Sequence, residues 1–297
     1  MPLFVKFWGT RGSIPTPGHR TQRFGGNTPC LEIRTEDLLI ACDGGTGLRE
    51  MGLDLQRRFG PKALTVHLFF SHPHWDHIQG FPFFTPAYMP NTILKVYGPA
   101  KGDHTIHDLL SGQMQSTYFP VTFSALGAKV ETTDLDPSGQ KELDRLRVTA
   151  FAQAHPGGSL GYAFEYDGSK VVYSTDNEID RVLEDPKAVE KNPKALRKIP
   201  DDLVEFCKGA DLLIADGQYT DAEYLRRVGW GHPRATTVVD LAVRAHVKQL
   251  AITHHDPMHS DADVDSIVAT CSRRAQEHGS QVVVFGAREG IELKIGT

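Results

Sequence analysis

A seven-residue segment rich in metal-binding side chains most constrains the fold of this chain. Residues 71–77 read Ser-His-Pro-His-Trp-Asp-His and directly follow an apolar run from Val66 to Phe70. Such a run predicts a buried strand, so the His and Asp side chains stand at its carboxyl end, on the turn into a helix. Imidazole and carboxylate groups suit zinc and similar divalent ions, and a loop at a strand end can aim several of them at one point. We therefore expect His72, His74, Asp76 and His77 to bind metal.

A polar surface loop or a single structural metal would also explain a turn rich in histidine. A structural zinc site is normally closed by Cys or His from a second knuckle nearby. No such spacing exists here, because the four cysteines are scattered at Cys30, Cys42, Cys207 and Cys271. The sequence therefore favours an open, catalytic metal site.

Short β-branched or aromatic runs dominate the first part of the chain, and helical patterns alternate with strands in the second. Predicted strands span 3–8, 30–35, 38–42, 65–70, 93–97, 146–152, 160–166, 170–174, 249–253 and 281–285. Predicted helices span 103–118, 201–208, 221–228, 234–247 and 262–278. This order predicts an α/β protein, an αββα sandwich of two mixed β-sheets flanked by helices.

The length of 297 residues allows one large domain or two small ones, and we expect a single domain over residues 1–297. Residues 178–200 are rich in Lys, Asp, Glu and Pro. They are predicted to form a solvated connection or a mobile flap.

Charge and composition bear on partners and location. The net charge of −5 argues against a surface that is basic overall, so binding of nucleic acid is neither supported nor excluded. Scattered cysteines fit a reducing compartment, and the amino terminus lacks the layout of a signal peptide. No apolar stretch reaches the length of about 18 residues that a membrane span needs. We expect a cytoplasmic protein with no membrane contact.

A pair of metal ions needs more ligands than residues 71–77 supply. Three further candidates each follow a buried run: His155 comes after the strand ending near Ala154, Asp176 after residues 171–175, and His254 after residues 250–253. Functional groups collect at such strand ends in α/β sheets. Taken singly, each residue could instead cap a strand or lie in a solvated turn.

The order His-x-His-x-Asp-His, then His, then Asp, then His resembles the metallo-β-lactamase superfamily over nearly the whole chain. The resemblance implies two divalent metal ions, which we expect to be zinc, with manganese or iron as alternatives. It implies that one ion is bound by His72, His74 and His155, the other by Asp76, His77 and His254, and that Asp176 bridges them. His255 competes for the role of His254, which we prefer because it comes first after the strand and matches the Thr-His position of the family.

Two glycine-rich turns, residues 9–13 and 43–47, resemble loops of the tRNase Z and cyclic-phosphodiesterase branches. Glycine at such turns lets backbone N–H groups approach anionic oxygens, although tight turns need glycine in any case. The pair Gly231-His232 before a predicted helix is a stronger sign. In tRNase Z-like phosphodiesterases a His at this place is thought to protonate the leaving alkoxide, which makes His232 the candidate general acid. A His held by backbone at a helix start is the alternative.

The expected reaction is attack of a metal-bridging hydroxide on a phosphodiester, with Asp76 orienting the hydroxide or accepting its proton. Pro233 and the pair His255-Asp256 depart from the tRNase Z pattern, and no long Gly/Pro/basic insertion forms a tRNA-gripping arm. A small or cyclic phosphodiester is therefore the preferred substrate. A nuclease like the tRNA 3'-end endonuclease, an acyl hydrolase acting on thioesters or lactams, and a metal-binding sensor without enzymatic activity are the alternatives.

Trp75 and the aromatic run 81–84 could line the substrate or form a homodimer contact, although aromatic residues after a strand more often pack in the core.

Overall fold

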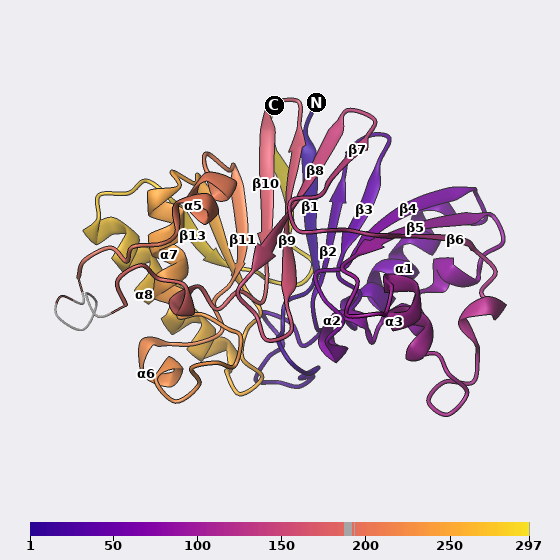
Figure 1. Ribbon diagram of the computed structural model, residues 1–297, viewed down its shortest axis with the longest axis horizontal. Helices are drawn as coiled ribbons and strands as arrows, with labels where there is room; N and C mark the ends of the chain where they lie inside the picture. Colours follow the sequence, from indigo (N-terminus) through magenta and orange to yellow (C-terminus); the bar gives the residue numbers. More distant parts are fainter. Residues whose placement is uncertain (187–191, 193, 297) are drawn as a thin grey trace. The chain divides into compact units, whose positions relative to one another are not determined.

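The computed structural model describes residues 1–186, 192 and 194–296. The chain divides into two compact units. Unit 1 comprises Met1–Gly139 with Arg288–Lys294, and unit 2 comprises Gln140–Ala287 with Ile295–Thr297. Each unit is built on a seven-stranded sheet (Figure 1). The single domain over residues 1–297 stays a prediction.

The sheet of unit 1 has the strand order β14-β1-β2-β3-β4-β5-β6. Its strands β1, β2 and β3 pair antiparallel, and β3 to β6 pair parallel, so the sheet is mixed. The bounds are β1 Leu3–Gly9, β2 Cys30–Arg34, β3 Leu39–Cys42, β4 Leu64–Phe69, β5 Thr92–Gly98, β6 Lys129–Asp134 and β14 Glu292–Ile295.

Helices cover this sheet with apolar faces. In α1 (Gly47–Phe59) the residues Leu48, Met51 and Leu55 are three and four apart, and all three are buried in one apolar cluster that includes Val66 of β4. Helix α3 (Ile106–Gly112) packs against β5 and β6. The shorter elements are α2 (Trp75–Ile78), η1 (Phe81–Phe83), η2 (Thr85–Tyr88) and η3 (Phe123–Ala125).

The sheet of unit 2 has the order β13-β12-β11-β10-β9-β8-β7 and is also mixed, since β7 to β10 pair antiparallel and β10 to β13 parallel. The turn Asp167-Gly168 between β9 and β10 has φ values of 50° and 78°, as a tight hairpin needs, which confirms the predicted turn. The bounds are β7 Gln140–Leu143, β8 Leu146–Gln153, β9 Ser159–Tyr166, β10 Ser169–Ser174, β11 Leu212–Asp216, β12 Gln249–Thr253 and β13 Val283–Gly286.

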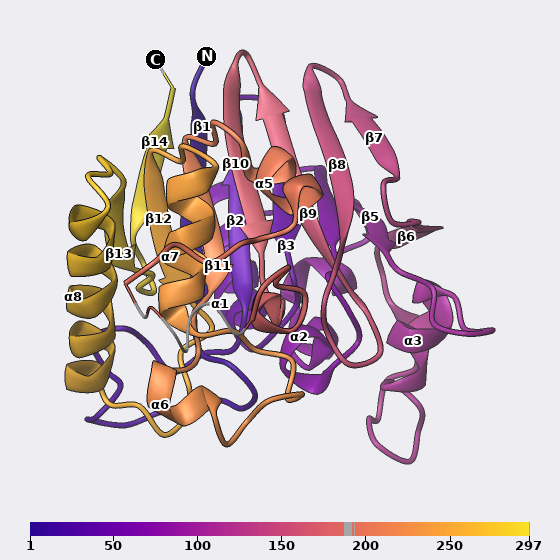
Figure 2. The same ribbon diagram turned by 60° about the vertical axis from the view of Figure 1, so that its left-hand side comes forward.

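Helix α7 (Ala235–Arg244) is the central helix of unit 2. It packs against β11 and β12 and alongside α8 (Asp261–Glu277), as Figure 2 shows. Its first eight residues are buried, so it forms much of the core on that face of the sheet. The remaining helices are η4 (Ile179–Arg181), α5 (Asp201–Cys207) and α6 (Asp221–Tyr224).

Several predicted elements differ from the observed ones. The helix expected over 103–118 is shortened to α3, and the one over 221–228 to α6. Gly229 and Gly231, with φ values of 88° and 96°, lie in the loop that follows α6. Helix α1 and strands β6, β7, β11 and β14 were not predicted. In the segment 178–200, residues 187–191 and 193 lie outside the described residues. Its described flanks are not solvated throughout, since Glu178, Asp180 and Arg197 are buried.

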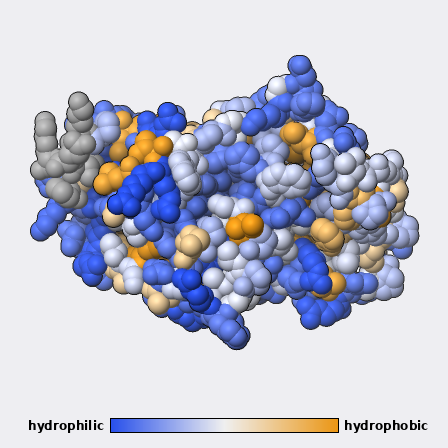
Figure 3. All heavy atoms as spheres, turned by 90° about the horizontal axis from the view of Figure 1, so that it is seen from below, coloured by the Kyte–Doolittle hydropathy of each residue, from blue (hydrophilic) through white to orange (hydrophobic). Residues whose placement is uncertain are grey.

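In the described part of the chain no helix has the length and apolar character to cross a membrane. Figure 3 shows one face on which hydrophilic side chains predominate and hydrophobic ones form small separate patches.

Candidate functional site

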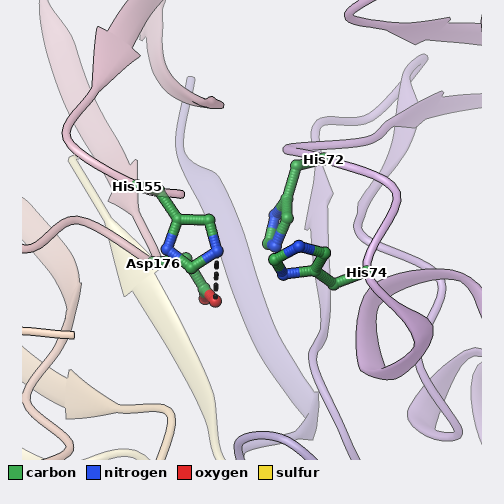
Figure 4. Close-up of side chains that lie close together, drawn as sticks. All are labelled: His72, His74, His155 and Asp176. Carbon is green, nitrogen blue, oxygen red and sulfur yellow. Dashed lines mark ion pairs between the residues drawn. The ribbon is translucent and has the colours of Figure 1, made fainter. Parts of the chain in front are cut away.

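The loop after β4 brings four predicted metal ligands together, and we call His72, His74, Asp76 and His77 the unit 1 half-site. The ring centroid of His72 lies 4.4 Å from that of His74 and 4.3 Å from that of His77. Nε2 of His77 lies 3.2 Å from Oδ2 of Asp76. His74 is exposed while the other three are buried, and Figure 4 shows the rings of His72 and His74 close together.

Asp43 orients this half-site from the end of β3. Its Oδ2 lies 2.8 Å from Nδ1 of His77, and its two oxygens accept hydrogen bonds from the backbone N–H and the hydroxyl of Ser71 at 2.7 and 2.9 Å. The Ser71 hydroxyl in turn lies 3.0 Å from Nδ1 of His72. A carboxylate that accepts the Nδ1 proton of His77 fixes the tautomer with the lone pair on Nε2, the nitrogen that faces Asp76.

The glycine-rich turns act as scaffolding for the same ligands. The backbone N–H of Ser13, in the turn 9–13, donates to Oδ2 of Asp76 at 2.8 Å. In the turn 43–47, a Cβ at Gly45 would overlap the carbonyl oxygen of Asp76, so close packing of two backbones requires glycine there. The first turn therefore binds the side chain of Asp76, and the second packs closely against its backbone.

In unit 2, His155, Asp176 and His254 follow β8, β10 and β12, and their side chains meet. Oδ1 of Asp176 lies 3.1 Å from Nε2 of His254, and Oδ2 lies 3.8 Å from Nε2 of His155, the pair joined by the dashed line in Figure 4. All three side chains are at most 2% exposed. The two oxygens of Asp176 thus face two different imidazoles, as a carboxylate that bridges two ions would.

Strained backbone accompanies these strand ends. Asp176 has a φ of 45°, His254 a φ of 57° and Asp43 a φ of 59°. Few residues other than glycine adopt the left-handed region, and the cost is of order 1–3 kcal/mol each. Hydrogen bonds and packing around each side chain must offset this cost, which is common where a side chain has to point in one functional direction.

Neighbouring oxygens also fix the imidazoles of unit 2. Nδ1 of His254 lies 2.9 Å from Oε1 of Gln218, and Nδ1 of His155 lies 3.0 Å from the carbonyl oxygen of Gly231. Both acceptors take an Nδ1 proton, so both histidines present the Nε2 lone pair to the side of Asp176. His255 instead places its Nε2 2.9 Å from the carbonyl oxygen of Ala287, so His254 and not His255 lies beside Asp176.

His232 joins the same group of side chains. Its Nδ1 lies 2.8 Å from Oδ2 of Asp216, and its ring stacks on that of His254 with centroids 4.8 Å apart. Together with Asp176, these residues form a group whose ligand atoms lie within 4.8 Å of one another. We call His155, Asp176, Asp216, His232 and His254 the unit 2 half-site.

Asp216 is not among the residues predicted from the sequence, although its local sequence has the same signal as Asp176. Asp216 follows the buried run from Leu212 to Ala215, the same pattern that singles out Asp176. Among the other histidines, His19, His104 and His107 are exposed, whereas the buried His259 lies 2.8 Å from Oε1 of Glu223.

The donor set of both half-sites suits a divalent metal ion. Neutral imidazoles with a defined tautomer, combined with carboxylates, are the ligands of zinc, manganese and iron sites. Nδ1 of His72, His77, His155 and His254 is in each case next to an oxygen, which makes Nε2 the nitrogen for a metal.

Comparison with known proteins agrees with this chemistry. Residues 40–255 match the model of the Beta-lactamase superfamily domain, and the chain therefore belongs to the metallo-β-lactamase superfamily. A protein named Ribonuclease Z from Natronomonas pharaonis is 26% identical over 289 residues, which cover 86% of this chain and 87% of the relative. Similarity to such relatives confirms the predicted tRNase Z-like branch, and the chain is a hydrolase of this superfamily.

Solved structures share the fold. The metallo-β-lactamase fold protein YhfI from Bacillus subtilis matches with a TM-score of 0.67 and 17% identity, covering 99% of this chain and 100% of that one. The short form of human tRNase Z matches with a TM-score of 0.64 and 19% identity, with the same coverage. The predicted fold class, two mixed sheets flanked by helices, is confirmed.

Proposed function

We propose that this hydrolase is a phosphodiesterase with two divalent metal ions, bound jointly by the two half-sites. The ligand set is the one that the family resemblance implies. It assigns His72, His74 and His155 to one ion, Asp76, His77 and His254 to the other, and Asp176 as the bridge. Zinc is the proposed metal, with manganese or iron as alternatives that the same ligands accept.

The pairing of His232 with Asp216 is the observation that supports phosphodiester cleavage. An alkoxide leaves a phosphodiester poorly unless it is protonated, so a positioned acid is needed. Asp216 lies at Nδ1 of His232, which leaves Nε2 of the same ring to deliver a proton to the leaving oxygen. Stacking on His254 keeps the donor next to the metal ligands. Acyl hydrolysis by the same fold would not require such a pair.

The remaining residues bind and orient. When bound, the metal ions would supply a water whose pKa falls to about 7 and would stabilise negative charge on the phosphoryl oxygens. Asp76, held by the N–H of Ser13, would orient the attacking water or accept its proton. The proton that reaches the leaving group comes from His232.

The proposed substrate is a small or cyclic phosphodiester. The net charge of −5 and the lack of a long basic insertion in the sequence support it over a large nucleic acid. A nuclease acting on the 3' end of tRNA is the second candidate, because the curated relatives are named Ribonuclease Z. A cytoplasmic location remains part of the proposal, and the four buried, free cysteines support it.

A substrate screen tests this function. The metal-loaded protein is assayed on bis(p-nitrophenyl) phosphate, a cyclic nucleotide, a precursor tRNA, a thioester and a β-lactam. We expect hydrolysis of the phosphodiesters and at most trace acyl cleavage, and we expect Asp76→Ala and His74→Ala to abolish turnover and lower the metal content. Unchanged phosphodiester hydrolysis in these variants, or thioester or lactam cleavage that exceeds it, would overturn the proposal.

A further inference from the structure

We infer that Glu178 is a positioning residue that fixes the proton donor His232 and the proposed metal ligand His155 relative to each other. This inference rests on the proposed function, because it takes His232 as the general acid. We call residues 229–234 the donor loop, since they carry His232 between Gly231 and the start of α7. Glu178 lies two residues after Asp176, in the segment for which the sequence suggests a solvated connection.

The carboxylate of Glu178 binds the donor loop on the amino-terminal side of His232. Oε1 accepts hydrogen bonds from the backbone N–H of Gly229 at 2.6 Å and from the hydroxyl of Tyr224 at 2.9 Å, and Oε2 accepts from the N–H of Gly231 at 2.8 Å. The side chain belongs to a residue only 1% exposed. Burial of a carboxylate is costly unless donors satisfy it, and here two of the three donors are backbone groups of one loop.

Gly231 transmits this contact to a metal ligand. Its N–H binds Glu178, while its carbonyl oxygen lies 3.0 Å from Nδ1 of His155. Its φ is 96°, and a Cβ at this position would overlap the His155 ring, so only glycine fits between the two. Displacement of Gly231 therefore moves His155 and His232 together.

Asp180 holds the carboxyl-terminal side of the same loop. It accepts hydrogen bonds from the N–H of Arg234 at 2.8 Å and from the hydroxyl of Thr237 at 2.7 Å. Asp176, Glu178 and Asp180 alternate along one short segment, which thus contributes a metal ligand and both anchors of the donor loop. Glu178 binds the backbone N–H groups of Gly229 and of Gly231, the residue directly before His232. The geometry therefore assigns Glu178 to the positioning of the proton donor.

The test uses two phosphodiesters of similar size that differ in their need for an acid. Bis(p-nitrophenyl) phosphate releases a nitrophenolate that leaves unaided, whereas diphenyl phosphate releases a phenolate whose pKa is about 10, as in tyrosine. In Glu178→Gln one acceptor oxygen becomes an NH2 group that faces a donor. We expect kcat on diphenyl phosphate to fall by on the order of 10²-fold, and kcat on the nitrophenyl ester to fall much less.

Two further readouts separate positioning from loss of structure. Metal content and melting temperature are measured for each variant, because a metal-depleted or unfolded protein loses both activities in proportion. Glu205→Gln is the matched control, since Glu205 is exposed and pairs with Lys208, which is also exposed and lies one helical turn away. If Glu178→Gln does not fold, Tyr224→Phe is used, because it removes a single hydrogen bond from the same carboxylate. It should lower kcat on diphenyl phosphate more than kcat on the nitrophenyl ester, by a smaller factor than Glu178→Gln.

His232→Ala distinguishes the two proposals. If this variant lowers kcat on both substrates by the same factor, His232 is not the general acid, and this part of the proposed function is wrong. If His232→Ala lowers kcat on diphenyl phosphate more than on the nitrophenyl ester, His232 is supported as the general acid. If neither Glu178→Gln nor Tyr224→Phe then shows this difference, the positioning role of Glu178 is overturned. Selective loss in all three variants supports both.

Discussion

At the scale of single residues, the orientation of His77 and of His254 is set by partners outside the proposed ligand set. Asp43 at Nδ1 of His77 and Gln218 at Nδ1 of His254 leave Nε2 of both rings for a metal. Such partners typically account for a factor of about 10–100 in metal affinity, because they fix tautomer and ring direction.

Replacement of Asp43 should weaken the metal site without touching a ligand. In Asp43→Asn the carboxylate loses its charge and one of its acceptor oxygens, which serve both His77 and Ser71. We expect zinc affinity, measured by competition with a chromophoric chelator, to fall about 10–100-fold. Asp37→Asn, on an exposed turn of the same unit, should bind zinc like the unaltered protein. Equal affinity in both variants would contradict the role of Asp43.

The neighbours His254 and His255 should differ in what their loss changes. His254→Ala removes an imidazole beside Asp176 and should lower the amount of bound metal. His255→Ala removes a buried hydrogen bond to the carbonyl oxygen of Ala287 and should reduce the free energy of unfolding by about 1–3 kcal/mol while the metal content stays constant. Elemental analysis and urea unfolding measure the two effects, and the opposite pattern would make His255 the ligand.

The sequence identifies the ligands better than their supporting residues, for a physical reason. His72, His155, Asp176 and His254 stand directly after apolar runs, which is a local signal. The local sequence around Asp43 indicates a turn, and that around Glu178 a solvated connection. The hydrogen-bond partner of Asp43, His77, lies 34 residues away in the chain. The partners of Glu178, from Tyr224 to Gly231, lie 46 to 53 residues away. Only tertiary structure brings such partners together.

At the scale of elements, the donor loop depends on one glycine. Gly231→Ala combines a φ of 96° with overlap of the His155 ring, so the loop or the imidazole must move. We expect phosphodiester hydrolysis to fall at least tenfold, as misplacement of a catalytic group by about 1 Å costs up to 10²-fold. Gly112→Ala, in α3, meets no atom within 4 Å and should retain full activity. Activity of Gly231→Ala equal to that of the control would argue against a fixed donor loop.

The elements themselves follow their sequence signals to different degrees. Helices α7 and α8 agree with the predicted spans within a few residues, because their apolar residues recur three and four apart. Strands β6, β7 and β14 were missed because most of their residues are exposed or half-buried, so they show no apolar run. Helix α1 was not predicted because it begins at the last residue of the glycine-rich turn 43–47, although Leu48, Met51 and Leu55 have helical spacing.

At the scale of the whole molecule, buried thiols report on the integrity of each unit. Cys30 and Cys42 lie in unit 1, Cys207 and Cys271 in unit 2, and all four are free and buried. Burial raises the pKa of Cys207 and Cys271 to about 12, and burial with nearby carboxylates raises the pKa of Cys30 and Cys42 well above its usual value.

The native protein should therefore resist thiol reagents. At pH 8 very little thiolate forms in the folded state, and the reagent has no access, so we expect no labelling by Ellman's reagent until guanidinium unfolds the chain. Mass spectrometry of the labelled peptides would then show which unit opens first. Rapid labelling of any of the four cysteines in the native protein would contradict the burial described for its unit.

The central proposal is that His72, His74, Asp76, His77, His155 and His254 hold one pair of metal ions, with Asp176 shared between the two ions. Metal content per chain, measured by elemental mass spectrometry on the zinc-saturated protein and on Asp176→Ala, tests it most directly. We expect two ions per chain in the unaltered protein and fewer than two in the variant. One ion or none in the unaltered protein, or two retained without Asp176, would contradict it.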